Sequence, residues 1–453
     1  MQPQITVILD NGASSIKAGL ARGPEGDDDD QPKGNSRLIP NAIVRSKGDK
    51  TTYFGHQLER CRDYSALHYR LPFEKGYLVD WDAQKAVWDG VFSSEVLNVD
   101  TAESSLLITE PYFNLPNIQD VYDQFVFEEY EFYSYHRCTP AATIPFGHLF
   151  QAGGPSPPEC LVVIDSGFSF THVVPIINNQ IQWYAVKRLD VGGKLLTNQL
   201  KELVSYRQWN MMDETYIMNH AKETCCYVST GFFEDLETCR SNPKKNSIVR
   251  EYVLPNFSIN RPGRIRLPNE ELSTTDQVLH MENERFTIPE LLFRPDDIGL
   301  EQSGLAATVA ASIALLPHDL RGMFWANIGL IGGSTNFPGF YERLSSELLS
   351  LTPVEYELQI YRSEDAITEA YRSAIAFVND PAFSAHVVTR EEYLEVGSNA
   401  SRRKFSGWQS SSAPGDADIS KITQESMIED RGQPSRKPNR SRMRTTTAPG
   451  RRR

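Results

Sequence analysis

Two short segments of the chain repeat one order of residue types: an apolar run, an aspartate, a small polar residue and a glycine. The first holds Asp10 within residues 8–14, and the second holds Asp165 within residues 163–169. Each pattern predicts two strands joined by a tight turn that carries a carboxylate at its tip. The N–H groups of such a turn converge on one point and can bind an anion. Two tips that face each other would therefore hold a polyphosphate together with its metal ion.

The candidate ligands lie at these tips and just after them. Gly12 and Gly167 lack a Cβ, so the backbone can approach a phosphate closely. Lys17 follows the first tip, where its ammonium would reach a β- or γ-phosphate. Mg²⁺ keeps several waters and prefers carboxylate oxygens, so Asp10 and Asp165 are its candidate ligands, through water. The candidate nucleotide ligands of the two tips are Asp10, Asn11, Gly12, Ala13, Ser14, Lys17, Asp165, Ser166, Gly167 and Ser169.

A third glycine-rich element comes late in the chain. Gly332, Gly333 and Ser334 follow a predicted buried strand and precede a predicted helix, which suits close backbone approach to a nucleotide. Phe337 follows them and could lie against a base. Each element alone is weak evidence, because Asp-x-Gly also occurs in ordinary hairpins. Three elements in this order indicate a nucleotide site.

The elements that must position these residues alternate between strands and helices, which predicts an α/β fold. The apolar spacing predicts strands at 106–108, 161–164, 171–177 and 327–331, and helices at 81–96, 117–130, 193–205, 211–228, 304–315, 339–351 and 364–377. Residues 241–275 are polar and rich in proline, which predicts irregular structure. Because the hairpin pattern occurs twice, we expect two related lobes with a ligand cleft between them.

Composition narrows the class of protein. No window approaches 18 uninterrupted apolar residues, so no membrane partner is expected. Six scattered cysteines without a CxxC pair argue against a zinc site and favour a reducing compartment.

Charge is spread unevenly along the chain. The net charge is −13, although residues 431–453 contain nine basic residues and no acid, so the remainder carries −22. Residues 401–453 are rich in Ser, Arg and Pro, which predicts a disordered tail. Its positive charge would allow salt-dependent, nonspecific DNA contact. A tail that is merely solvated is an equally good interpretation.

The glycine and aspartate elements, taken with the segments between them, resemble the actin family from residue 5 to 397. The matching segments are 8–12, 17–19, 163–167, 171–175, 188–193, 221–223, 226–228, 284–286, 332–335 and 337–339. This resemblance implies an actin-like two-lobed fold (duplicated ribonuclease H-like domains) over residues 1–400. It implies a small lobe of 1–146 and 366–400, a large lobe of 147–365, and a cleft that holds ATP with Mg²⁺. It also adds Gly193, Lys222 and Glu223 to the candidate nucleotide ligands.

Two further segments, 107–114 and 391–397, resemble nuclear actin-related proteins. Those proteins are subunits of SWR-type chromatin remodelling complexes, which exchange a variant histone into nucleosomes. The resemblance implies the other subunits of such a complex as partners, indirect contact with histones or nucleosomes, and location in the nucleus, with the cytoplasm as a second site.

The departures from actin concern catalysis. Ala13-Ser14 stands where actin has Ser-Gly, and Phe168-Ser169 stands where it has Asp-Gly. Actin carries a glutamine in this part of its chain that orients the attacking water, but no glutamine lies between residues 124 and 151 here. The corresponding stretch is His-Arg-Cys-Thr-Pro at residues 136–140. Loss of one such contact costs roughly 2.7–4 kcal/mol. We therefore expect no catalytic residue, and ATP with Mg²⁺ either as a structural ligand or not at all. His172 matches a family residue near the attacking water.

Assembly features decide among three hypotheses. Only residues 46–52 separate Arg45 from Tyr53, far fewer than in the filament-contacting loop of actin, so no self-polymerisation is expected. The first hypothesis is a non-catalytic nuclear scaffold. The second is an ATPase or sugar kinase on the same fold, and the third is a cytoplasmic actin relative of a filament-end or motor-cargo complex. The missing glutamine, the changed turn residues and the short filament-contacting loop favour the first hypothesis.

Overall fold

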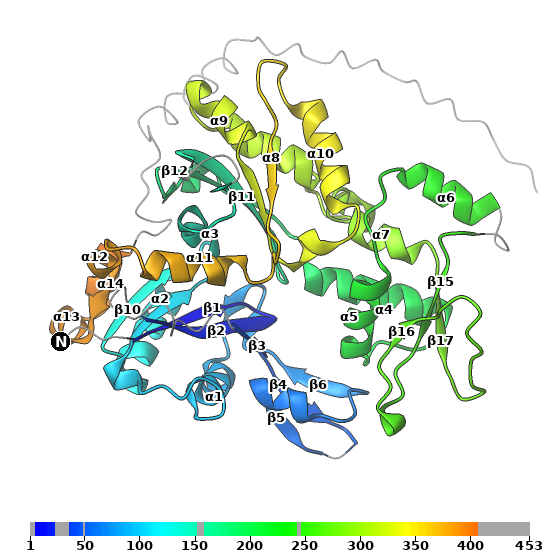
Figure 1. The fold of residues 1–453 in the computed structure, drawn as a ribbon, viewed down its shortest axis with the longest axis horizontal. Coiled ribbons are helices and arrows are strands. Elements are labelled where there is room, and N and C mark those ends of the chain that lie inside the picture. Colours follow the sequence, from blue (N-terminus) through cyan, green and yellow to red (C-terminus); the bar gives the residue numbers. More distant parts are fainter. Residues whose placement is uncertain (1–4, 23–35, 49, 152–157, 242–245, 406–453) are drawn as a thin grey trace, which may run out of the picture. The chain divides into compact units, whose positions relative to one another are not determined.

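The computed structural model describes residues 5–22, 36–48, 50–151, 158–241 and 246–405 (Figure 1). The predicted disordered tail falls outside this range from residue 406 onward. Within the described ranges, every helix is too short or too polar to cross a lipid bilayer.

The first sheet is built around the first hairpin. Strands β1 and β2 pair antiparallel with Asp10 opposite Lys17, and β1, β9 and β10 run parallel to one another. Parallel strands are buried on both faces, which explains the continuous apolar run of β1. The strand order is β20-β10-β9-β1-β2-β3. The bounds are β1 Ile5–Asn11, β2 Ser15–Arg22, β3 Arg37–Pro40, β9 Ser105–Thr109, β10 Ser134–Cys138 and β20 Val388–Thr389.

The second sheet repeats this plan around the second hairpin. Strands β11 and β12 pair antiparallel with Asp165 opposite His172, and β11, β18 and β19 run parallel. The strand order is β13-β12-β11-β18-β19, with β14 beside β12. The bounds are β11 Cys160–Ser166, β12 Thr171–Ile177, β13 Gln180–Ile181, β14 Lys187–Leu189, β18 Ile328–Ile331 and β19 Ile360–Arg362. The α/β class and the duplicated hairpin are therefore confirmed.

Helices cover both sheets. Helix α1 buries Val87, Trp88 and Val91 against the first sheet, and Asp80 caps its N-terminus by accepting from the Ala83 N–H. A larger core joins the second sheet to helices α4, α5, α7, α8 and α10. The bounds are α1 Trp81–Phe92, α3 Pro140–Thr143, α4 Gly193–Arg207, α5 Thr215–Cys225, α6 Phe232–Ser241, α7 Glu284–Glu290, α8 Leu305–Ala314, α9 Arg321–Trp325, α10 Phe340–Leu351, α11 Glu369–Val378 and α12 Phe383–His386.

A small sheet precedes α1 in the chain. Strand β4 pairs antiparallel with both β5 and β6, and the hairpin β7–β8 follows. A 3-10 turn, Gly55–Arg60, follows β5. The bounds are β4 Ile43–Ser46, β5 Thr52–Phe54, β6 Leu67–Arg70, β7 Phe73–Glu74 and β8 Tyr77–Leu78.

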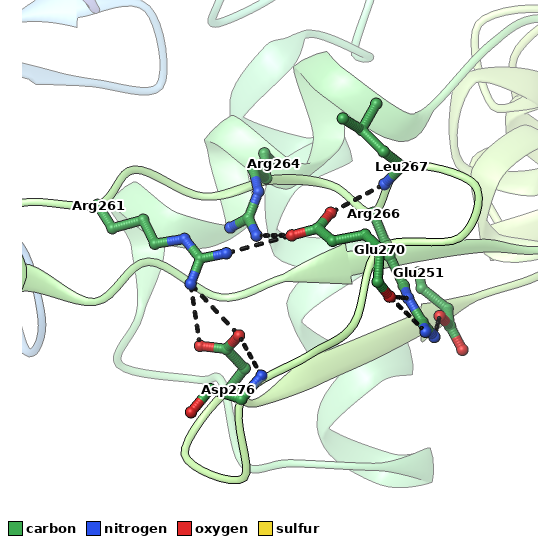
Figure 2. Close-up of polar contacts among 8 residues, drawn as sticks. Glu251, Arg261, Arg264, Arg266, Leu267, Glu270 and Asp276 are labelled. Carbon is green, nitrogen blue, oxygen red and sulfur yellow. Dashed lines mark hydrogen bonds and ion pairs between the residues drawn. The ribbon is translucent and has the colours of Figure 1, made fainter.

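Several predicted elements were wrong in extent: the helices expected at 81–96, 211–228 and 364–377 are the shorter α1, α5 and α11. The helix expected at 117–130 is α2, Pro116–Gln124, followed by a π-helical turn, Phe125–Glu129. The region expected to be irregular contains a three-stranded sheet of β15 Arg250–Val253, β16 Arg264–Ile265 and β17 Val278–Met281. Figure 2 shows the ion pairs that hold its connections: Arg261 and Arg264 both reach Glu270, and Arg266 reaches Glu251. Because charged side chains hold these connections, the sequence there lacks the apolar periodicity that predicts strands.

The expected start of the tail at residue 401 was also wrong. Helix α13, Arg390–Val396, is followed by α14, Asn399–Lys404. Phe405 is 7% exposed and packs edge-on against Tyr135 and His136. The burial of this one aromatic ring fixes the chain to the first sheet beyond the predicted boundary.

Candidate nucleotide site

Both carboxylate oxygens of Asp10 contact polar side chains of the protein. The Thr109 hydroxyl donates to Oδ1 at 2.8 Å, and Lys17 Nζ lies 3.1 Å from Oδ2. The same Thr109 hydroxyl accepts from the Asn11 N–H at 2.9 Å. Lys17 is thus close to the first tip, as predicted, but its charge is balanced there by Asp10.

The first tip is supported from behind by an asparagine that the sequence did not single out. Asn41 donates its side-chain amide to the Gly12 carbonyl at 3.0 Å and its N–H to the Ser14 carbonyl at 2.9 Å. Gln84 exchanges two further hydrogen bonds with the Asn41 amide. The Asn11 side chain turns inward and accepts from Trp88 Nε1 at 3.3 Å. Its amide is therefore used in the buried packing, and Asn11 as a nucleotide ligand stays a prediction.

Asp165, at the second tip, accepts a hydrogen bond from the Tyr112 hydroxyl at 2.9 Å. That hydroxyl in turn accepts from the Ala141 N–H at 3.2 Å. Burial raises the pKa of Asp165 to about 6, although the bond from Tyr112 opposes the rise; the charge of Asp10 adds to it. Thr109 bonds to Asp10 and Tyr112, three residues later, bonds to Asp165, so the two tips are neighbours, as the paired pattern predicted. The Ser166 hydroxyl bonds with that of Thr171 inside the sheet at 2.9 Å, so it is used within the fold.

At each tip, the glycine N–H has an acceptor within the chain, and the next two N–H groups have none in the part of the chain that the structure describes. The Gly12 N–H donates to the Asp10 carbonyl, and the Gly167 N–H donates to the Phe170 carbonyl. Within the described residues, the next two N–H groups of each tip donate to no other group of the chain: Ala13 and Ser14 on the first, and Phe168 and Ser169 on the second. Four open N–H groups beside one lysine fit a phosphate chain.

The third glycine element lies directly behind the second tip. Gly332 has a φ of +89°, and a Cβ there would lie 2.4 Å from the Ser166 carbonyl oxygen. The Gly332 N–H donates to the Ala366 carbonyl at 2.8 Å. Gly333 borders only Ile367, and Ser334 is buried. Phe337 is 9% exposed and belongs to the large core, and its place against a base stays a prediction.

The lysine expected to touch the nucleotide has a structural role. Lys222 Nζ donates to the Gly193 carbonyl, the Thr197 hydroxyl and the Asn219 side chain at 2.9–3.2 Å. Only 4% of Lys222 is exposed, and burial lowers its pKa. The prediction that Lys222 binds the nucleotide is therefore corrected, because its ammonium donors are used in bonds that connect α5 to the start of α4. Glu223 is exposed and accepts from Asn219 at 2.7 Å. Gly193 meets the second tip, where its N–H donates to the Gly167 carbonyl.

The stretch that replaces the water-orienting glutamine faces the core of the first sheet. Arg137 is 3% exposed, lies 3.2 Å from Glu110 and 3.1 Å from Asp123, and donates to the Gln119 carbonyl. His136 lies among aromatic rings, and burial lowers its pKa to about 4. Both side chains thus make polar contacts inside the fold, and His136 Nδ1 lies 3.0 Å from the His386 carbonyl oxygen.

His172 lies beside the second tip as a neutral ring. Its centroid is 4.3 Å from that of Tyr112, and burial together with the charge of Arg188 lowers its pKa to about 3. Thr109, Tyr112 and Asn41 are the site residues that sequence reasoning missed. Thr109 and Tyr112 belong to a segment that resembled the family, which was the only signal for them.

Comparison with known proteins decides the family. The family model "Actin" matches residues 1–406 of the chain. The chain belongs to the actin family. It is 51% identical to "Actin-like protein ARP6" of Cryptococcus neoformans over 420 residues, covering 88% of this chain and 84% of that protein. It is 40% identical to "Actin-like protein ARP6" of Yarrowia lipolytica, covering 88% of this chain and 97% of that protein. It is 37% identical to "Actin-related protein 6" of Drosophila melanogaster, covering 86% of this chain and 97% of that protein.

Actin-family folds generally bind a nucleotide, and the site of this actin-related chain fits one in its backbone. The open N–H groups and Lys17 would take the phosphates, and Asp10 and Asp165 would take Mg²⁺ through water. Among the described residues, no three His, Cys, Asp or Glu side chains gather as a direct metal site. A bound nucleotide would supply negative charge that replaces Asp10 beside Lys17.

Proposed function

We propose that this chain is a non-catalytic, non-polymerising nuclear scaffold subunit of a SWR-type chromatin remodelling complex. In this role it would bind other subunits of the complex and contact histones or nucleosomes through them. Support comes from family membership and from its similarity to proteins named actin-related protein 6. The cytoplasmic alternative has no observation in its favour.

The non-catalytic part of the proposal rests on the Tyr112–Asp165 hydrogen bond. A carboxylate that holds a metal-bound water accepts hydrogen bonds from that water, and Asp165 already accepts one from a phenol, so Tyr112 competes with the water for one of its oxygens. The polar groups of Arg137 and His136, which replace the water-orienting glutamine stretch, are used inside the fold. A nucleotide would then act as a structural ligand, adding about 2.7 kcal/mol of stability at 100 times its dissociation constant.

The non-polymerising part is supported by the short connection between β4, which ends at Ser46, and β5, which begins at Thr52. A chain that does not form filaments should remain monomeric in conditions that polymerise actin. Sedimentation of the purified chain would show this, and pelleted filaments would contradict it.

Affinity purification of the tagged full chain from nuclear extract, followed by mass spectrometry, tests the proposal. The expected result is recovery of the remodeller subunits, including its ATPase. Recovery of filament-end or motor-cargo proteins without remodeller subunits would overturn it. A chain truncated after residue 405 should recover the same subunits, and any loss of nonspecific DNA binding in that variant measures the contribution of the tail.

A further inference from the structure

An aromatic contact joins two segments that are far apart in the sequence. The rings of Tyr64 and Tyr216 stack with centroids 4.2 Å apart and planes 19° from parallel. Phe257 adds a third ring, whose centroid lies 5.7 Å from that of Tyr64. Tyr64 belongs to the connection before β6 and Tyr216 to the first turn of α5, and Figure 1 shows β4–β6 next to α4 and α5.

Polar contacts accompany the stacked rings. The Ala66 N–H donates to Glu214 at 2.9 Å, and Lys47 lies 3.3 Å from Asp213. The Tyr64 hydroxyl donates to the Leu58 carbonyl at 3.1 Å, which fixes the orientation of the ring. The Lys47 pair is exposed and weak, so the Tyr64–Tyr216 stack and the Ala66–Glu214 bond carry the contact.

Each side of this contact is connected to one tip of the nucleotide site. Asn41 lies two residues before β4 and bonds to the first tip at Gly12 and Ser14. On the other side, Lys222 shares α5 with Tyr216 and bonds to Gly193, whose N–H bonds to the second tip. The Tyr112–Asp165 bond already joins the two sides near the tips. The tyrosine pair therefore closes a ring of contacts around the space between the tips.

We propose that the Tyr64–Tyr216 stack, with the Ala66–Glu214 bond, is a latch that must open before a nucleotide can enter or leave. This inference rests on the proposed nucleotide site and not on the remodeller role. A closed latch restricts passage in both directions, so it slows association and dissociation alike. Its removal should change both rates by the same factor and leave the dissociation constant nearly unchanged.

Stopped-flow fluorescence with etheno-ATP and Mg²⁺ measures both rates on the full chain. We expect Tyr64→Ala and Tyr216→Ala to raise association and release about tenfold, the factor that corresponds to about 1.4 kcal/mol. Tyr64→Phe keeps the stacked ring and loses only the bond to Leu58, so it should change the rates far less than Tyr64→Ala. Tyr206→Ala is the matched control, because Tyr206 is a tyrosine on neighbouring helix α4 that is 93% exposed. Rates unchanged in both alanine variants overturn the latch, and so does a change confined to release.

Amide hydrogen exchange without nucleotide tests the latch independently of binding. Tyr64→Ala should increase exchange in residues 213–217 on the opposite side by at least threefold, and Tyr216→Ala should do the same in residues 62–67. Tyr206→Ala should change neither. Effects limited to the mutated side overturn the latch, and this measurement decides alone if the probe does not bind. A chain that shows the latch and yet fails to recover remodeller subunits would refute only the proposed function.

Discussion

The Tyr112 hydroxyl donates to the Asp165 carboxylate at 2.9 Å, across a separation of 53 residues in the sequence. Asp165 lies at the second tip, at the end of a strand of the second sheet, and Tyr112 follows strand β9 of the first sheet. The bond therefore connects the two sheets at the carboxylate that a metal-bound nucleotide would need.

Tyr112→Phe should free Asp165 for the metal. Breaking a hydrogen bond to a charged group costs about 1.5 kcal/mol, so we expect Mg²⁺·ATP to bind roughly tenfold more tightly to the variant. Isothermal titration calorimetry would measure this, with Tyr206→Phe as the control. The gain should vanish in EDTA. Equal affinity in the variant and the wild type would show that Tyr112 does not compete with the metal.

Arg137→Leu should be strongly destabilising. It leaves Glu110 and Asp123 buried without their counter-ion, which costs about 3–5 kcal/mol. Burial already raises the pKa of Asp123 to about 6, so protonation should relieve part of the cost at pH 5 compared with pH 8. Urea unfolding measures both values. Arg240→Leu, at a side chain that is 80% exposed, should cost little; a similar loss in both variants would contradict the role of Arg137.

Gly332→Ala tests the close approach of the third glycine element to the second tip. Its Cβ would lie 2.4 Å from the Ser166 carbonyl oxygen, in a backbone conformation with φ of +89°. Gly397→Ala is the matched control, because Gly397 also combines a positive φ (+64°) with an extended ψ and has open space around it. Left-handed backbone alone costs an alanine about 1–2 kcal/mol, so thermal unfolding should show a clearly larger loss for Gly332→Ala. Equal losses would mean that the tip moves aside freely.

Acid should remove the stability that a neutral His136 provides. Its pKa is about 4 in the fold and 6.5 when exposed, so the unfolded chain binds the proton more tightly. This stability is complete above pH 6.5 and is lost as the pH falls toward 4, by about 3 kcal/mol at 1.36 kcal/mol per pKa unit.

His136→Asn retains an amide donor near the His386 carbonyl and cannot titrate in this range. The variant should be less stable at pH 7, yet its stability should fall less between pH 6.5 and 4. Because the raised pKa values of Asp123 and Asp165 act in the opposite sense, the difference between the two chains is the quantity to measure. Parallel curves would contradict a neutral buried His136.

Local patterns were sufficient to predict the two hairpins, the glycine element at 332–334 and the α/β class. Asp10 and Asp165 stand at strand ends because apolar strands and Gly turns are encoded over a few residues. The partners of these carboxylates were not predictable in this way. Thr109 and Tyr112 meet them only after two sheets have formed, and nothing in their own neighbourhood marks them.

Which candidate side chains are available to a ligand was less predictable than the positions of the turns. Lys222 fitted the family segment, but its burial depends on the packing of α4 against α5. Phe337 likewise belongs to a core assembled from distant helices. The lobe boundaries at 146–147 and 365–366 remain predictions.

A single-turnover assay with labelled ATP, Mg²⁺ and the full chain in excess tests most directly whether this site serves structure and not catalysis. The account predicts phosphate release at the rate measured without protein, in the wild type and in Tyr64→Ala alike. Release well above that rate, abolished by Asp165→Asn, would contradict it and restore the enzyme hypothesis.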